Sequence, residues 1–161
     1  MKLLDSGLQR ERTAARTAVI LLVEDELGDQ ELTRRALLEG KTEKDLHVVK
    51  DGEEALDYLQ RRGRYAEGKR WPLPDLILLD LNLPRLDGRQ FLAHIKADPR
   101  LRRIPVVVLT TSQQEKDIVQ SYDAGANSYI VKPTTVDQSL KLVQALEAYW
   151  FEAVELPPLE D

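Results

Sequence analysis

The 161-residue chain contains no cysteine and only two histidines, His47 and His94, which lie far apart in the sequence. Disulfides and thiolate metal sites are therefore excluded, and a histidine-based zinc site is disfavoured. No apolar run approaches the roughly 18 residues that span a bilayer. The net charge of −5 argues against nonspecific nucleic-acid binding, which relies on Lys and Arg to neutralise phosphates. We expect a cytoplasmic protein with no membrane partner and no direct nucleic-acid partner.

The chain does contain a regular alternation of short apolar runs and amphipathic segments. The apolar runs predict strands buried on both faces, at 18–25, 46–50, 75–80, 104–112 and 128–133. The amphipathic segments predict helices at 28–40, 52–63, 88–98, 114–126 and 135–154. This alternation is typical of an α/β fold, a parallel sheet with helices on both faces. We expect a polar, mobile arm over 1–16, one domain over 17–154 and an acidic tail over 155–161.

Reactive side chains stand at the ends of four predicted strands. Glu24 and Asp25 end the first, Asp80 the third, Thr110 lies near the end of the fourth, and Lys132 ends the fifth. The carboxyl ends of parallel strands meet at one edge of the sheet, where ligands bind. Crowded carboxylates repel one another, and an oxygen-only ligand set suits Mg²⁺. A carboxylate beside Mg²⁺ can attack phosphorus to form an aspartyl phosphate, while a lysine and a hydroxyl neutralise the phosphoryl oxygens.

Each of these residues also has an ordinary structural explanation. Asp80 fits a helix cap or a turn, and Glu24 with Asp25 fits the positive end of a helix. Thr110 fits a helix cap, and Lys132 fits a solvated strand end. Caps alone do not explain why all of them fall at the ends of separate buried strands, so the combination favours a functional site.

Four segments together resemble the receiver domain of two-component response regulators. They are "LLVED", "DLILLDLNLPRLDG", "IPVVVLTTS" and "YIVKP", in matching order and spacing. The resemblance covers about 17–154 and implies a flavodoxin-like, doubly wound, five-stranded parallel sheet of strand order 2-1-3-4-5. It also implies a phosphoacceptor signalling protein, which takes a phosphoryl group from a sensor histidine kinase in a reaction that needs Mg²⁺ or Mn²⁺.

The resemblance assigns a role to each matching acidic residue. It implies that Asp80 is the phosphorylated aspartate. Asp25 would bind the metal directly, Glu24 would act mostly through water, and the backbone carbonyl of Asn82 would be a further ligand. Asp80 itself would also face the metal.

The same resemblance assigns roles on the last two strands. Lys132 would pair with the phosphoryl group, and its bond to Pro133 would be cis. Thr110 and Tyr129 would form a switch pair, in which Thr110 moves toward the phosphoryl group and the Tyr129 ring turns inward. A half-buried aromatic at the sheet edge is the alternative for Tyr129.

Within this family the chain is most similar to phytochrome-associated response regulators, on the segments "LTTS", "SY" and "YWFEAVELP". This similarity implies a phytochrome-type kinase as the phosphodonor. Glu26 departs from the subfamily, which often carries a neutral Asn after the acid pair. The extra charge would either tighten Mg²⁺ binding or slow an anionic phosphodonor.

The C-terminal helix and tail are informative about signal output, because we expect no attached effector in the seven residues after Val154. We therefore expect signalling through partner binding or a homodimer. Apolar residues beyond the core stripe of the last helix would form an interface, with candidates Leu142, Tyr149, Trp150, Phe151 and Val154. The alternative is that the tail folds back on its own domain.

Two other functions use a similar fold. Phosphohydrolases of the haloacid-dehalogenase type carry a general acid two residues after the nucleophilic aspartate, where this chain has Asn82. Flavin-binding modules need a neutral phosphate loop after the first strand, whereas this chain has the acidic "VEDELGD".

Overall fold

Five parallel strands form the centre of the computed structural model, which describes residues 17–67 and 70–159. The predicted arm at 1–16 and the last two residues of the predicted tail lie outside these described residues. The strand order β2-β1-β3-β4-β5 confirms the predicted fold class and order. The strands are β1 (Ala18–Val23), β2 (Lys44–Val49), β3 (Leu76–Leu79), β4 (Val106–Thr110) and β5 (Ser128–Val131).

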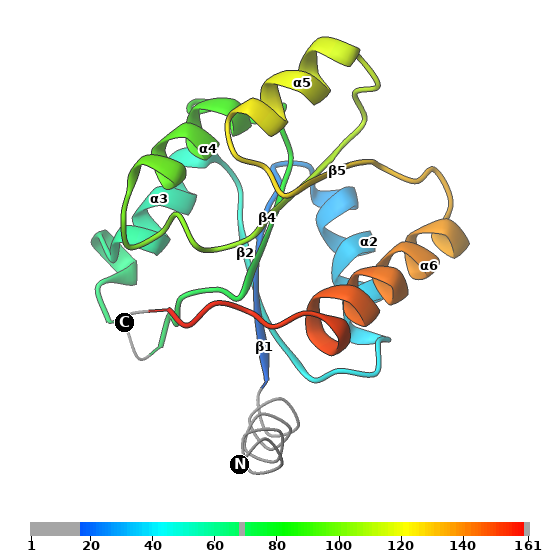
Figure 1. Ribbon diagram of the computed structural model, residues 1–161. Helices are drawn as coiled ribbons and strands as arrows, with labels where there is room; N and C mark the ends of the chain where they lie inside the picture. The colour runs from blue at the N-terminus through cyan, green and yellow to red at the C-terminus, as the bar shows by residue number, and fades with distance from the viewer. Residues whose placement is uncertain (1–16, 68–69, 160–161) are drawn as a thin grey trace, which may run out of the picture.

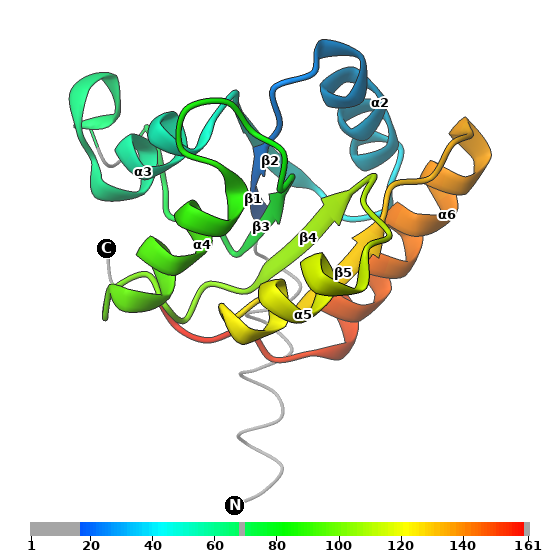
Figure 2. The same ribbon diagram turned by 90° about the horizontal axis from the view of Figure 1, so that it is seen from above.

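Helices cover both faces of this sheet. The α-helices are α2 (Leu27–Leu38), α3 (Gly52–Gln60), α4 (Gly88–Ala97), α5 (Glu115–Asp123) and α6 (Val136–Glu147). Figure 1 shows α3, α4 and α5 on one face of the sheet and α2 with α6 on the other. Figure 2 shows the same division from above. A short 3₁₀ helix, Gly63–Tyr65, follows α3.

The inner strands β1 and β3 are apolar at every position, and β4 is apolar up to Thr110, because both faces of the sheet are covered there. Leu21 and Val23 of β1 belong to the core under α3 and α4, whereas Ile20 and Leu22 belong to the core under α2 and α6. The same alternation runs through β3 and β4. Each strand is thereby held rigidly, and the polar residues that follow it are placed with equal precision.

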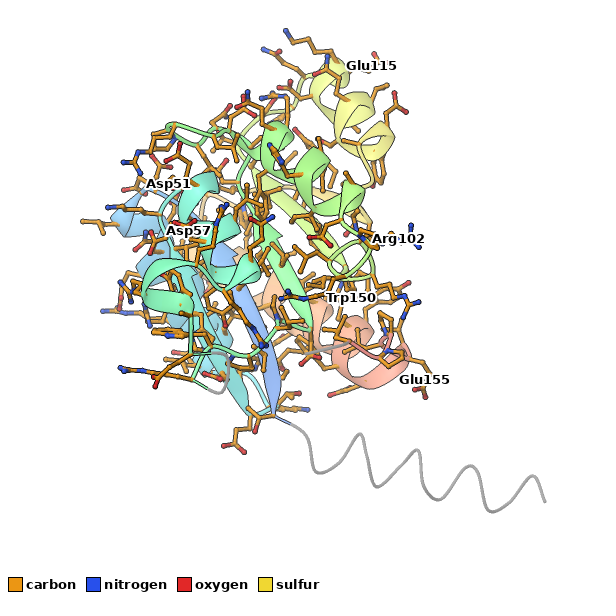
Figure 3. All side chains as sticks on the ribbon, turned by 90° about the vertical axis from the view of Figure 1, so that its left-hand side faces the viewer. Asp51, Asp57, Arg102, Glu115, Trp150 and Glu155 are labelled. Carbon is orange, nitrogen blue, oxygen red and sulfur yellow. The ribbon has the colours of Figure 1, made fainter. Side chains whose placement is uncertain are left out.

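The helices on both faces begin at the edge where the strands end. Asp51 and Asp87 cap α3 and α4 through their side chains, and Asp87 forms a capping box with Gln90. Figure 3 shows Asp51 and Glu115, at the starts of α3 and α5, toward the upper end, and Trp150 toward the lower end. The caps fix the direction in which the chain leaves the sheet, and so leave the crevice between the strand ends accessible.

The end of the chain differs from the single helix predicted over 135–154. The α-helix stops at Glu147 and continues as a π-helix, Ala148–Ala153, whose wider turn changes the facing of its side chains. Trp150 and Phe151 pack on the core beneath α2 and α6, and Leu159 packs on the core of the opposite face. The tail therefore runs from the α6 side of the sheet to the side of α3 and α4 (Figure 1), which agrees with the fold-back alternative. No described helix has the length and apolar character needed to cross a bilayer.

Candidate functional site

Three carboxylates meet at the carboxyl edge of β1 and β3. Glu24 and Asp25 follow β1, Asp80 follows β3, and one oxygen from each lies within 4.8 Å of the other two. The backbone of Asp80 is tied to β1, because its N–H donates to the carbonyl of Val23 at 3.1 Å. Glu24 and Asp80 are buried, whereas Asp25 is exposed. The site is therefore a negatively charged crevice with one side open to solvent.

The ammonium group of Lys132 lies among these carboxylates, directly after β5. Its Nζ donates to Glu24 Oε1 through a short hydrogen bond, to Asp80 Oδ2 at 2.9 Å and to Asp29 Oδ2 at 2.8 Å. An ammonium group has three N–H donors, so these carboxylates use all of them. The structure thus brings together the predicted set of Glu24, Asp25, Asp80 and Lys132.

Burial and charge shift the proton affinities of this cluster. Burial raises the pKa of Glu24 to about 7, and the negative charge of Asp80 adds to this rise, while the hydrogen bond and charge of Lys132 oppose it. Burial by itself lowers the pKa of Lys132, but its hydrogen bonds to the three carboxylates outweigh burial and place the pKa above its usual value. Lys132 therefore stays positively charged. Its single positive charge does not balance the negative charges of the several carboxylates around it.

The loop after β3 is built closely around Asp80. The N–H of Asn82 donates to Asp80 Oδ1 at 3.1 Å, and the N–H of Gly88 donates to the carbonyl of Leu81 at 3.0 Å. A Cβ on Gly88 would lie 2.4 Å from the backbone oxygen of Asp80. Glycine at this position therefore lets α4 start directly against the strand end and turns the chain away from the crevice.

Thr110 and Tyr129, the predicted switch pair, lie on β4 and β5. Thr110 is fully buried, and its hydroxyl has no hydrogen-bond partner in the described part of the chain. Buried hydroxyls are usually paired, so the Thr110 hydroxyl is free to donate a hydrogen bond to a group that binds in the crevice. The Tyr129 hydroxyl donates to the backbone oxygen of Ser112 at 2.9 Å and its ring packs against the core. Tyr129 is thus connected to the loop that follows Thr110.

A polar network that the sequence did not predict secures this loop. The buried carboxylate of Asp117 accepts from the Ser112 hydroxyl at 2.6 Å and from Arg89 at 2.5 Å. These hydrogen bonds, from Ser112 first and then Arg89, lower the pKa of Asp117. The network joins α4, α5 and the loop between β4 and α5. The sequence gives no signal for it, because its members are separated by 28 and 5 positions without a motif.

Pro133 does not follow the predicted geometry. The described residues contain no cis peptide bond, so the expected cis bond between Lys132 and Pro133 is wrong. The trans form is the intrinsically favoured isomer even before proline. The trans bond still leaves Lys132 in contact with Glu24 and Asp80.

Glu26 and Asp29, at the start of α2, have roles that the sequence did not predict. The Glu26 carboxylate accepts from the N–H groups of Gly28 and Asp29, at 3.1 and 2.8 Å, and thereby caps the helix. The Asp29 carboxylate contacts Lys132. An acidic residue in a first helical turn is common because it complements the helix dipole, so the position of Asp29 did not distinguish it from an ordinary surface acid.

Comparison with known proteins identifies the family of this chain. The sequence model of the response regulator receiver domain matches residues 20–144. The chain belongs to the response regulator receiver family. The response regulator Rcp1 of Synechocystis sp. is 46% identical to this receiver over 139 residues, which are 86% of this chain and 92% of that protein.

Solved structures of response regulators share the fold of this receiver. The phosphorylated cyanobacterial phytochrome response regulator RcpA has a TM-score of 0.83 and 45% identity, and the match covers 89% of this chain and 100% of that one. The Mn²⁺-bound form of Rcp1 has a TM-score of 0.79 and 45% identity, with 88% and 99% covered. These findings confirm that the protein is a response regulator of two-component signalling, and favour that function over a phosphohydrolase or a flavin module.

Proposed function

We propose that this response regulator accepts a phosphoryl group on Asp80. The observation that carries the proposal is the meeting of three carboxylates and Lys132 at one crevice, from strands that are distant in sequence. Asp80 stands at the end of the central strand β3, between β1 and β4. Its carboxylate is the member of the cluster with direct contacts to both Lys132 and the Asn82 backbone.

A divalent cation fits the donor set beside Asp80. The donors are carboxylate oxygens, which hard cations such as Mg²⁺ prefer, and burial together with the neighbouring charge of Asp80 raises the pKa of Glu24. We assign Asp25 and Asp80 as ligands, Glu24 as a ligand through water and Asn82 as a ligand through its backbone carbonyl. Mg²⁺ or Mn²⁺ would neutralise charge on the phosphoryl oxygens. The Mn²⁺-bound form of Rcp1 supports this assignment.

The protein's own residues contribute positioning and charge to the transfer. A carboxylate oxygen of Asp80 attacks phosphorus, the bond from phosphorus to the donor's nitrogen or oxygen breaks, and the donor leaves with that electron pair. Lys132 donates to a phosphoryl oxygen as negative charge is transferred. The unpaired hydroxyl of Thr110 supplies a further donor, and its movement would change the surroundings of Tyr129.

We infer that the phosphodonor is a phytochrome-type sensor histidine kinase. Support comes from the match to a cyanobacterial phytochrome response regulator over the whole of that chain. Support also comes from the 34%-identical response regulator RPA3017 in red light signalling of R. palustris, which has a TM-score of 0.83 and covers 88% of this chain. The inferred role of the protein is to receive a phosphoryl group, not to turn over a substrate as an enzyme does.

Incubation with a small acyl phosphate tests the proposed reaction. We expect a gain in mass of one phosphoryl group that is lost at alkaline pH, because acyl phosphates are labile to base. The gain requires Mg²⁺ or Mn²⁺ and is absent after chelation. A mass gain that is independent of divalent cations would contradict the proposed site.

We also propose that a second copy of this chain binds at the C-terminal surface. Trp150, Phe151 and Leu142 pack against the protein's own core, which leaves Tyr149 and Val154 as the more available candidates. Tyr149 is 56% exposed although it is a large aromatic residue, and its ring stacks edge-on against Trp150. An exposed aromatic held rigidly beside an apolar cluster is typical of an interface.

Tyr149→Lys tests this dimer without disturbing the core. We expect the wild-type protein to sediment as a dimer and the variant to sediment as a monomer, because a charge at the centre of an apolar interface is not compensated. Tyr122→Lys is a matched control, since Tyr122 on α5 is 48% exposed. A wild-type monomer at high protein concentration, or a dimeric Tyr149→Lys variant, would refute the proposed interface.

A further inference from the structure

Two of the three hydrogen bonds of Lys132 go to residues with a role in the proposed reaction, and the third does not. The bond to Asp80 joins the lysine to the proposed phosphoacceptor, and the bond to Glu24 joins it to a proposed metal ligand. The third bond, to Asp29, joins it to a residue that has no part in the proposed chemistry. Asp29 therefore uses one donor of the active-site lysine without an evident benefit to the reaction.

The contact is too specific for a surface acid that only complements the helix dipole. Asp29 Oδ2 lies 2.8 Å from Lys132 Nζ across 103 positions of sequence. The side chain of Lys132 is 12% exposed and that of Asp29 is 38% exposed. The Glu26 cap fixes the Asp29 backbone by accepting its N–H, so the carboxylate is held at the side of the crevice nearest α2.

The geometry points to Asp29 as a positioning residue that holds Lys132 in the resting protein and competes with the phosphoryl group for it. This inference rests on the proposed phosphorylation of Asp80. A phosphoryl group needs donors from an ammonium group that three carboxylates already occupy. The charge of Asp29 also repels an incoming anion. Asp29 thus weakens the phosphorylated state relative to the resting state.

Beryllofluoride, a stable mimic of an aspartate-bound phosphoryl group, measures this competition at equilibrium. Asp29→Asn keeps the size of the side chain and one acceptor oxygen but removes the charge. We expect it to bind beryllofluoride about three- to tenfold more tightly than wild type at saturating Mg²⁺. That range lies between an exposed ion pair and a buried charge-assisted hydrogen bond. Structural damage does not produce such a gain in affinity, so the direction distinguishes positioning from folding.

Two further variants separate the contact from a general charge effect. Glu31→Gln removes a negative charge from the same helix, at a residue that pairs with Arg35 on the surface. We expect its affinity to stay close to wild type. Asp29→Glu restores the charge, and we expect it to return the affinity toward the wild-type value.

The possible failures are distinguishable. Wild-type protein that binds no beryllofluoride at saturating Mg²⁺ would refute the proposed function itself. Wild-type binding together with an unchanged or weaker Asp29→Asn variant would refute the role of Asp29 alone. Equal gains in Asp29→Asn and Glu31→Gln would also overturn it, because net charge would then explain the effect.

Discussion

Lys132→Met lowers the rate of Asp80 phosphorylation by an acyl phosphate by about 10²- to 10³-fold, the loss typical of removing one donor from a developing negative charge. Methionine retains an unbranched side chain of similar length but donates no hydrogen bond to the phosphoryl oxygens. The rate is measured by intact-protein mass spectrometry at fixed Mg²⁺. A variant that is phosphorylated at the wild-type rate would show that Lys132 has only a structural role.

The same variant should also be less stable when divalent cations are removed. Lys132 contacts Glu24 and Asp80, whose side chains are 4% and 10% exposed, so its loss leaves two buried carboxylates without their partner. We expect the free energy of unfolding to fall by about 3 kcal/mol in the presence of a chelator. Mg²⁺ should restore more stability to the variant than to wild type, because Lys132 no longer competes for the carboxylates.

Lys96→Met is the matched control for this effect. Lys96 donates to the backbone oxygens of Arg102 and Ile104, both at 3.0 Å, and pairs with no carboxylate among the residues that the structure describes. Its loss should destabilise the protein without any rescue by Mg²⁺. Urea unfolding followed by tryptophan fluorescence reports on both variants, since Trp71 and Trp150 pack against the two cores.

Asp25→Asn weakens Mg²⁺ binding by about 10- to 100-fold or more. A loss of about 10- to 100-fold is typical when a residue that only hydrogen-bonds to a metal ligand is replaced, and we assign Asp25 as a ligand itself. The substitution also removes one of three mutually repelling carboxylates. We therefore expect stability without metal to remain equal to wild type or to rise, while the stabilisation by Mg²⁺ is lost. Simple damage to the fold lowers stability under both conditions.

The measurement for Asp25 is the midpoint of urea unfolding as a function of Mg²⁺ concentration. Asp57→Asn serves as the control, because Asp57 on α3 pairs with Arg62 and lies outside the crevice. If Asp25→Asn and Asp57→Asn responded to Mg²⁺ in the same way as wild type, the metal site would have to be placed elsewhere.

The sheet and the acidic crevice could be predicted from the sequence because strong, local signals specify them. A strand buried on both faces is apolar at every position, as in "LILL" of β3, and the polar residue that follows marks its end. Parallel topology then brings Glu24, Asp80 and Lys132 to one edge. No long-range information beyond strand order was needed to place these three residues together.

Contacts that depend on side-chain direction could not be predicted in this way. Asp29 and Asp117 are acidic residues in first helical turns, where the same residue type is common for reasons of helix stability. Only the three-dimensional arrangement shows that one contacts Lys132 and the other ties Ser112 to Arg89. The π-helix after Glu147 was missed because its sequence continues the helical pattern of α6.

The central claim is that Asp80 carries the phosphoryl group, and borohydride reduction after phosphorylation tests it most directly. Reduction converts an aspartyl phosphate to homoserine, which mass spectrometry locates after digestion with trypsin. The tryptic peptide 71–85 contains both Asp75 and Asp80, and Asp75 is an internal control whose carboxylate accepts from the N–H of Val19 at 2.9 Å. We predict homoserine at position 80 and unchanged aspartate at position 75. Homoserine at position 75, at position 25 or at any other residue would contradict the assignment.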